Sequence, residues 1–370
     1  MIPPFDREKA KKETEQYLAL ADGAQPDRIV ANPLVMGQSA LLHGKTINDW
    51  YTKPKIGAQM LLNAVTCYNV PLLPIASTWA YGTAWCEDYG GEVKWPTGNA
   101  GAPGIAKHPY SKPEEVDSFQ AQTPEEISKG PTYAKLWEAM EVTKKTLGPL
   151  FNGWGCPYEP FVIASYWFGP EQMLLWVNRE PKLLKDLVSK TVEFLVNANE
   201  LAARKYGGAN LIVASLLANS QTMSPQNCWD FSLRYTKEMV EKSLKAGAGP
   251  IVWYHQCGDH EGDCKLHADL PLPKGSIMHP TYWGLKPAPL AETAKIFGSK
   301  CIVMGNVDTA SFLNKTSSEI YEESKQQVEQ GKSSGFKKGF IAGIGCEMPP
   351  YAPYANVEAF MRAVREHGKL

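Results

Sequence analysis

The chain has 370 residues, and its 38 basic and 39 acidic side chains leave a formal net charge of -1. This balance gives no long-range attraction to nucleic acid or to an anionic membrane, so we expect neither as a partner. No apolar stretch approaches the roughly 20 residues that span a bilayer, and the N-terminus has no apolar signal core. The eight cysteines are scattered and do not predict a disulfide framework. We therefore expect a cytoplasmic protein with a substantial core.

The first predicted element is a helix at residues 7–21, rich in Glu, Lys and Ala, within an N-terminal helical extension over residues 1–25. After it, short apolar runs alternate with amphipathic stretches that are long enough for a helix. Two helix starts are clear: Pro181 opens one that ends at Gly207, and Ser224 caps another before Pro225. The apolar runs predict eight strands, at residues 28–32, 70–76, 161–167, 210–215, 251–255, 276–279, 301–305 and 340–343.

Eight strands with helical crossovers predict a (β/α)₈ barrel. The alternative is a doubly wound open sheet, which usually has fewer strands and often a Gly-rich phosphate turn that this sequence lacks. We expect a single barrel domain over residues 26–370, with a long inserted loop at residues 77–160. Within this loop, residues 132–146 predict a helix. Long loops in compact domains tend to be functional, and this one leaves from the catalytic face of a barrel.

The most informative motif is His255-Gln256-Cys257-Gly258, which ends one apolar run, together with Cys346, which ends another. In a barrel, both lie at the carboxyl edge of the sheet, where the active sites of this fold are found. One imidazole and two thiolates suit zinc, and three protein ligands with an open fourth position are typical of a catalytic site. Such an ion can activate a thiol or polarise an ether oxygen, and both steps serve methyl transfer.

Other interpretations of these residues stand beside this one. A buried cysteine most often only packs, as we expect for Cys67, Cys86, Cys228 and Cys301. Cys257, His260, Cys264 and His267 form a local cluster that could bind zinc structurally, but the surrounding glycines and charges predict a solvated loop. We take His279 and Asp308 as candidate catalytic residues, with ordinary hydrogen-bonding roles as the alternative. Glu347 is a candidate fourth zinc ligand, with a surface role equally open.

Aromatic residues gather near the predicted strand ends and in the long loop. If part of them face the pocket, the site suits a flat apolar substrate; otherwise they pack in the core and rim. Side chains alternate along a strand, so Trp253 and Tyr254 cannot both point inward. The candidate pocket residues are Trp79, Tyr81, Trp167, Tyr254 and Tyr282.

From about Pro26 onward, the chain resembles the uroporphyrinogen decarboxylase superfamily, and within it the zinc- and corrinoid-dependent methyltransferases. The resemblance is strongest at residues 251–258, 305–308 and 343–353. It implies a (β/α)₈ barrel, and zinc bound by His255, Cys257 and Cys346. The arginine-bearing motif (RxAGR) of the decarboxylase branch is missing, because residues 35–44 contain no arginine. The resemblance also implies a cobalamin or related corrinoid cofactor on a separate carrier protein, since the cobalt motif (DxHxxG) is absent here.

The leading hypothesis is a zinc-dependent methyltransferase that moves a methyl group from a methylated small molecule to the cobalt of a separate corrinoid protein. The aromatic residues favour a methoxylated aromatic donor and hence O-demethylation. The alternative is a methylcobamide:thiol methyltransferase of the coenzyme M type, which would use the same metal site. A porphyrinogen-type decarboxylase is disfavoured by the missing arginine motif. A non-enzymatic barrel with a structural zinc, or none, is the alternative from a different class.

Overall fold

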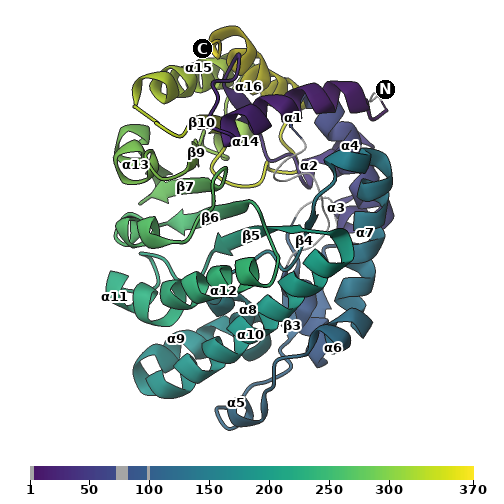
Figure 1. The fold of residues 1–370 in the computed structure, drawn as a ribbon, viewed down its shortest axis with the longest axis vertical. Coiled ribbons are helices and arrows are strands. Elements are labelled where there is room, and N and C mark those ends of the chain that lie inside the picture. The colour runs from purple at the N-terminus through teal and green to yellow at the C-terminus, as the bar shows by residue number, and fades with distance from the viewer. Residues whose placement is uncertain (1–3, 72–81, 98–100) are drawn as a thin grey trace.

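A computed structural model describes residues 4–71, 82–97 and 101–370 of the chain. Within these residues, seven strands form a sheet in the order β1-β10-β9-β7-β6-β5-β4, and every neighbouring pair is parallel. The sheet curls and helices surround it (Figure 1). The strands are β1 (Val30–Asn32), β4 (Gly153–Trp154), β5 (Ala209–Ser215), β6 (Val252–Asp259), β7 (Ile277–Trp283), β9 (Ile302–Met304) and β10 (Phe340–Gly343).

Three further strands are short. β8 (Lys286–Pro287) folds back antiparallel on β7, and β2 (Glu92–Lys94) pairs antiparallel with β3 (Gly104–Lys107) in a separate two-stranded sheet. The strands predicted at residues 28–32, 210–215, 251–255, 276–279, 301–305 and 340–343 correspond to β1, β5, β6, β7, β9 and β10, so these predictions are confirmed. Their residues are almost all buried, as parallel strands covered on both faces require.

The predicted helices are also confirmed where their signals are strong. α1 (Arg7–Ala21) begins at Asp6, whose side chain accepts from the backbone N–H of Lys9. α10 (Pro181–Tyr206) has proline in its first turn and ends at Gly207 in the left-handed conformation. α11 (Pro225–Cys228) is capped by the Ser224 hydroxyl, and the helix predicted at 132–146 is α7 (Pro131–Leu147).

The remaining helices connect the strands and cover the sheet. The α-helices are α2 (Gln38–Leu42), α3 (Ile47–Thr52), α4 (Pro54–Tyr68), α5 (Glu115–Ser118), α6 (Pro124–Lys129), α9 (Pro170–Arg179), α12 (Arg234–Lys245), α13 (Leu290–Phe297), α14 (Ser311–Asn314), α15 (Ser317–Ser333) and α16 (Tyr354–His367). Three 3₁₀ turns are η1 (Gly82–Tyr89), η2 (Gly148–Leu150) and η4 (Cys264–Asp269), and η3 (Trp229–Leu233) is a π-helical turn. Among the described residues, no helix combines the length and apolar character needed to cross a bilayer.

One predicted strand is wrong: residues 161–167 belong to a helix, α8 (Pro160–Phe168). A continuous apolar run fits a buried helix as well as a buried strand, so its periodicity did not discriminate. Pro160 opens this helix and Gly169, at φ 86°, ends it. The sheet instead gains β4, whose Gly153 and Trp154 pair with Ala209 and Asn210 of β5. Of the strand predicted at residues 70–76, all but Val70 and Pro71 lie outside the described residues.

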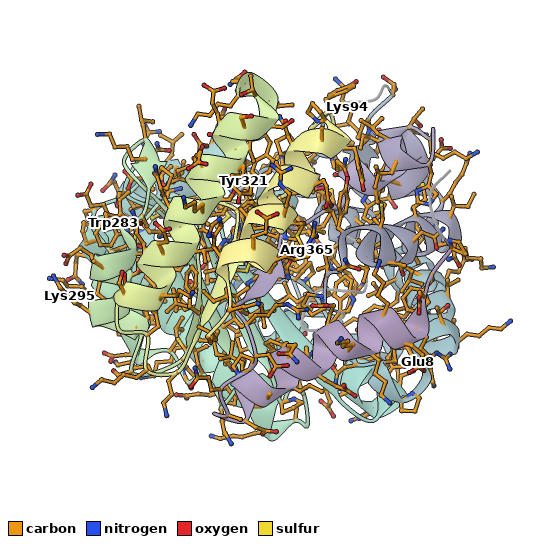
Figure 2. All side chains as sticks on the ribbon, turned by 90° about the horizontal axis from the view of Figure 1, so that it is seen from above. Glu8, Lys94, Trp283, Lys295, Tyr321 and Arg365 are labelled. Atoms are coloured by element: carbon orange, nitrogen blue, oxygen red, sulfur yellow. The ribbon has the colours of Figure 1, made fainter. Side chains whose placement is uncertain are left out.

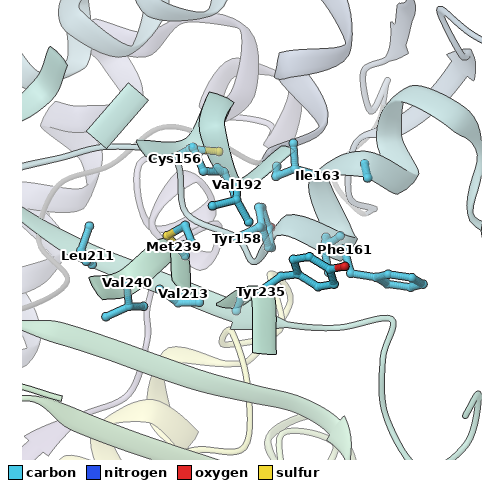
Figure 3. Close-up of a cluster of buried hydrophobic side chains, with 14 of the residues drawn as sticks. Cys156, Tyr158, Phe161, Ile163, Val192, Leu211, Val213, Tyr235, Met239 and Val240 are labelled. Carbon is cyan, nitrogen blue, oxygen red and sulfur yellow. The ribbon is translucent and has the colours of Figure 1, made fainter. Parts of the chain in front are cut away.

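Hydrophobic packing between β5 and the helices α8, α10 and α12 supports this side of the sheet. In Figure 3, Leu211 and Val213 of β5 lie beside Met239 and Val240 of α12 and Val192 of α10, all at most 1% exposed. Charged side chains occupy the outside, such as Glu8 on α1, Lys295 on α13 and Arg365 on α16 (Figure 2). The core therefore holds β5 and β6 rigidly, and these two strands carry much of the site described next.

Candidate metal centre

His255 and Cys257 lie near the carboxyl end of β6, and Cys346 follows the carboxyl end of β10. In the sheet, His255 pairs with Ala214 of β5 on one side and with His279 of β7 on the other. Because the strands are parallel, their carboxyl ends meet at one edge of the sheet. The three predicted ligands, which are up to 91 residues apart in sequence, therefore meet in space.

The distances between the three side chains suit one metal ion. The Cys257 and Cys346 Sγ atoms are 3.8 Å apart, and Cys346 Sγ is 3.7 Å from His255 Nε2. All three ligand atoms lie within 4.8 Å of one another. In a tetrahedral zinc site, the usual Zn–S and Zn–N bond lengths place ligand atoms roughly 3.5–3.8 Å apart. The geometry thus fits a His-Cys-Cys zinc set with one position left for a small molecule.

The two thiols differ in their acidity. The hydrogen bond from the Cys257 thiol, followed by the contact with His255, holds the pKa of Cys346 well below its usual value. The same bond to Cys346 and burial raise the pKa of Cys257 well above its usual value. A metal cation bound by both sulfur atoms would hold both as thiolates, because a coordinated thiol is deprotonated.

His279 fixes the tautomer of His255. Its Nε2 donates to the carbonyl of Ile344 at 2.8 Å, so its Nδ1 is an acceptor, and the Nδ1–H of His255 donates to it at 2.9 Å. The free lone pair of His255 is then on Nε2, the atom that faces Cys346. Burial lowers the pKa of His279 well below its usual value, which keeps this imidazole neutral. The arrangement is the hydrogen-bonded outer partner that metal-binding histidines commonly have.

Replacing His279 with Phe is expected to lower zinc affinity by about 10- to 100-fold, since His255 Nδ1–H loses its acceptor and the tautomer is no longer fixed. The measurement is zinc affinity by competition with a chromophoric chelator. His279→Gln is the matched control, because its side-chain oxygen can accept the same hydrogen bond, and it should recover part of the affinity. Equal affinity in all three proteins would contradict this role.

A cavity of about 150 Å³ opens beside the three ligands. Its lining residues are Leu34, Met36, Trp154, Pro157, Tyr158, Ile212, Ala214, Leu216, Trp253, His255, Cys257, Cys346 and Glu347. The wall is mostly apolar, but the indole N–H groups of Trp154 and Trp253 have no acceptor among the described residues. Trp253 also stacks on the rings of His255 and His279, with centroids 5.6 and 5.9 Å apart. The cavity therefore offers a mostly apolar space that is walled in part by aromatic side chains.

Glu347 faces this cavity rather than the surface. Its Oε1 accepts from the backbone N–H of Gly37 at 2.8 Å, and burial raises the pKa of its carboxyl group to about 7. A side chain on residue 37 would come within 2.9 Å of the same oxygen, so glycine allows the close approach. Glu347 remains a candidate fourth ligand that lies beside Cys346.

The other predicted site residues lie in different places. Trp79 and Tyr81 fall outside the described residues. Trp167 does not line the cavity: it is on α8, fully buried among Tyr89, Phe119 and Phe194, and its indole donates to the carbonyl of Trp85. Tyr254 does not line it either, because it points to the opposite face of β6 from His255 and its hydroxyl contacts His267 at 3.0 Å.

Tyr282 and Asp308 are joined to each other next to the metal centre. The Tyr282 hydroxyl donates to Asp308 Oδ1 at 3.0 Å, and this carboxylate also accepts from the backbone N–H of Ala310. Neither residue is among those that line the cavity. A Cβ atom on Gly345 would approach the Tyr282 hydroxyl to 2.6 Å, so this pair packs against the backbone that carries Cys346. A positioning role fits this placement better than contact with a substrate.

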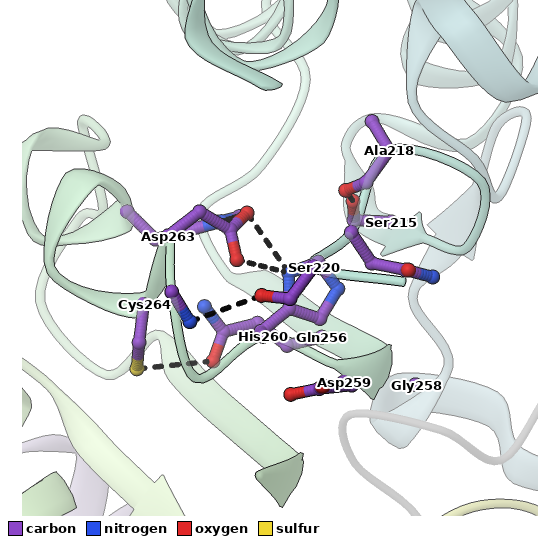
Figure 4. A network of polar contacts seen from close by, with 12 residues as sticks. Ser215, Ala218, Ser220, Gln256, Gly258, Asp259, His260, Asp263 and Cys264 are labelled. Atoms are coloured by element: carbon purple, nitrogen blue, oxygen red, sulfur yellow. Dashed lines mark hydrogen bonds and ion pairs between the residues drawn. The ribbon is translucent and has the colours of Figure 1, made fainter. Parts of the chain in front are cut away.

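A second buried polar cluster lies on the outer side of β6. His260 Nδ1 contacts both carboxylate oxygens of Asp263 at 3.0 and 3.1 Å, and His267 Nε2 contacts Asp263 at 2.9 Å. Burial alone would raise the pKa of Asp263, but the hydrogen bonds with His260 and His267 lower it below its usual value. Figure 4 shows Asp263 facing His260, with the Cys264 thiol bonded to Gln256 instead. The local cluster predicted from the sequence therefore keeps its two histidines but not Cys257 or Cys264.

Glu159 is buried close to this cluster. Hydroxyl groups of Ser215, Ser232 and Thr236 donate to its carboxyl oxygens, yet burial raises its pKa to about 7. In the unfolded chain a glutamate ionises near pH 4.5, so the unfolded state loses this proton first. This group therefore lowers the stability of the fold as the pH rises from about 4.5 to about 7, and its contribution is constant above that range.

The Glu159→Gln variant lacks this titration. Its free energy of unfolding, relative to the natural protein, is expected to increase between pH 4.5 and pH 7.5, by at most on the order of 3 kcal/mol. Urea unfolding of both proteins at several pH values measures this difference. Parallel stability curves for the two proteins would show that Glu159 ionises normally in the folded state.

Among the cavity residues that sequence reasoning missed are its three aromatic ones, Trp154, Tyr158 and Trp253. Trp154 belongs to β4 and Tyr158 follows it, and the two residues of this strand are too few to show any periodicity. For Trp253 a signal existed: it is two residues before His255 and four before Cys257, so strand alternation places all three on one face.

The fold and the site together define a (β/α)₈ barrel with a His-Cys-Cys set at its carboxyl edge. Residues 12–367 match the family described as Uroporphyrinogen decarboxylase (URO-D), and the chain belongs to this family. A solved methyltransferase from Methanosarcina mazei is similar with a TM-score of 0.76 and 18% identity, covering 96% of this chain and 98% of that one. This likeness confirms the predicted barrel fold.

A B12-independent methionine synthase from Shewanella sp. W3-18-1, in complex with selenomethionine, has a TM-score of 0.47 and 12% identity, covering 85% of this chain and 88% of that one. No curated protein matches the sequence.

Proposed function

We propose that this protein is a zinc-dependent methyltransferase that takes a methyl group from a methoxylated aromatic compound and passes it to the cobalt of a separate corrinoid protein. The observation that carries the proposal is the convergence of His255 Nε2, Cys257 Sγ and Cys346 Sγ beside one cavity. The barrel fold shared with a solved methyltransferase supports the reaction class. The corrinoid partner rests on the resemblance of the sequence motifs alone.

The cavity supports the choice of substrate. An apolar cavity of about 150 Å³ is the size that holds benzene, and the volume here is also about 150 Å³. No lysine or arginine is among the described residues that line the cavity, which disfavours a substrate with many carboxylates.

The chain's own groups have distinct roles in this reaction. His255, Cys257 and Cys346 hold the metal, and His279 holds His255 in the tautomer that binds it. A zinc ion bound there supplies a Lewis acid that polarises the ether oxygen. The apolar wall excludes water and orients the ring so that the methyl carbon is open to attack. A corrinoid in its Co(I) state on the partner protein would supply the electron pair that displaces the aryl oxygen from the methyl carbon, and the electron pair of the carbon–oxygen bond would leave with that oxygen. Glu347 lies beside Cys346, burial raises the pKa of its carboxyl group to about 7, and in its protonated form it would give a proton to the departing oxygen.

The test is the formation of methyl-Co(III) from free cob(I)alamin, followed by absorbance, with zinc-loaded protein and a panel of methyl donors. Anisoles are expected to react, and methanol, methylamines and methyl thioethers to react at least about 10-fold more slowly. If no aromatic ether reacts, the substrate assignment fails. A second arm supplies methylcobalamin and coenzyme M: methylation of the thiol, with no reaction of any ether, would establish the opposite direction of transfer.

A further inference from the structure

Three buried side chains outside the candidate metal centre bring their ligand atoms together. His260 and Asp263 follow β6, and His267 is on η4; their exposed fractions are 1%, 1% and 2%. One atom of each lies within 4.8 Å of the corresponding atoms of the other two. A fourth potential ligand, Cys228 at the end of α11, is 1% exposed, and burial and the nearby Asp263 carboxylate raise the pKa of its thiol. The cluster thus contains two imidazoles and a carboxylate in a space closed to solvent, with a thiol near the carboxylate.

The charge of Asp263 needs explanation in such a place. Buried carboxylates in proteins are paired with a cation or coordinate a metal. Among the ion pairs of the described residues, Asp263 is the one acid whose partners are imidazoles only. The remaining acids in these pairs have a lysine or arginine as partner. A divalent cation at this position would place positive charge beside the carboxylate, which has no lysine or arginine in the ion pairs of the described residues.

The surroundings of the cluster also match those of a metal site. His267 presents Nε2 to Asp263, and its other nitrogen, Nδ1, contacts the hydroxyl of Tyr254 at 3.0 Å. A histidine that binds a metal through one nitrogen commonly has the other held in this way. His260 Nε2 has no partner among the described residues. Directly after Cys228, the chain forms the π-helical turn η3, a feature that occurs frequently at functional sites.

We propose that His260, Asp263 and His267, with Cys228 as the fourth ligand, form a second zinc site that is closed and structural. Two nitrogens, one oxygen and one sulfur are ligands that zinc accepts, and four protein ligands leave no position for a substrate. The ion would tie the loop after β6 and η4 to the end of α11. It would thereby brace β6, the strand that carries His255 and Cys257, from its outer side.

The test is the zinc content of protein that has been incubated with excess Zn²⁺ and desalted, measured by mass spectrometry against protein sulfur. The natural protein is expected to hold two zinc ions per chain. The Cys257→Ser/Cys346→Ser double variant leaves the second cluster untouched and is expected to hold one. Adding Asp263→Asn, a nearly isosteric change, to the double variant should reduce the content to none.

The outcomes separate this proposal from the proposed function. If the double variant binds no zinc, the second site does not exist and the cluster is a hydrogen-bonded network only. If the natural protein and the double variant both hold one ion, the second site stands and the catalytic site fails. X-ray absorption of zinc in the double variant tests Cys228: one sulfur neighbour is expected, and it should disappear in a triple variant with Cys228→Ser. A spectrum without sulfur would exclude Cys228 as a ligand.

Discussion

Replacement of Cys346 with serine is expected to abolish zinc binding at the candidate metal centre and to lower methyl transfer by more than about 100-fold. A serine hydroxyl does not ionise near neutral pH and is a much poorer ligand for zinc than a thiolate. Cys346 contacts both Cys257 and His255, so its replacement removes the sulfur that approaches both other ligands. Cys257→Ser should have the same effect for the same reason.

Zinc content and the rate of methyl-Co(III) formation measure this prediction, and thermal unfolding shows whether the variants fold. Cys67→Ser is a suitable control, because Cys67 is a half-buried cysteine on α4 whose ionisable neighbours, Tyr354, Glu358 and Lys9, are not candidate ligands. It should retain both zinc and activity. If Cys257→Ser and Cys346→Ser retain zinc and activity as well, the metal centre has been assigned to the wrong residues.

The convergence of the three candidate zinc ligands could be predicted because two simple regularities agree. Apolar runs that end in polar or glycine-rich segments mark the ends of buried parallel strands. Parallel topology then brings those ends to one edge of the sheet, however distant they are in sequence. His255, Cys257 and Cys346 each directly follow or end such a run, and the structure places them together.

The walls of the cavity could not be predicted in the same way, since they depend on elements too short or too uniform to have a pattern. β4 has two residues, and α8 is apolar on nearly all sides, so neither shows a helical or strand period. The aromatic character of Tyr254 predicts a place in the pocket, but alternation from His255 gives the inward position to Trp253. The alternation of side chains along a strand is therefore a better predictor of which residues line the cavity than their aromatic character.

The cluster of His260, Asp263 and His267 shows a different limit of prediction from sequence. Residues 258–267 contain glycines and charged residues, which on average indicate a solvated loop. In the structure, however, His260, Asp263 and His267 are buried because they satisfy one another and cover the outer side of β6. Composition predicts exposure residue by residue, whereas burial of polar groups depends on whether partners are near in space.

Replacement of Ala214 with Phe is expected to block the cavity and leave the metal centre intact. Ala214 is on β5, pairs with His255 in the sheet, and lines the cavity with its methyl group. A phenyl ring at this position would occupy the space of about 150 Å³ that we assign to the substrate ring. Methyl transfer from anisoles should fall by more than about 100-fold while zinc content is unchanged, because no ligand is altered.

The loss of methyl transfer should depend on how much side-chain volume is added at residue 214. Ala214→Val fills only a small part of the cavity, so it should reduce kcat/KM for anisoles by about 10-fold or less, which corresponds to roughly 1.4 kcal/mol. Added core volume costs about 1–3 kcal/mol of stability when it is not accommodated, and thermal unfolding of both variants would reveal this. Undiminished turnover of anisoles by a folded, zinc-loaded Ala214→Phe protein would mean that the aromatic ring binds elsewhere, and the cavity would then no longer support the choice of substrate.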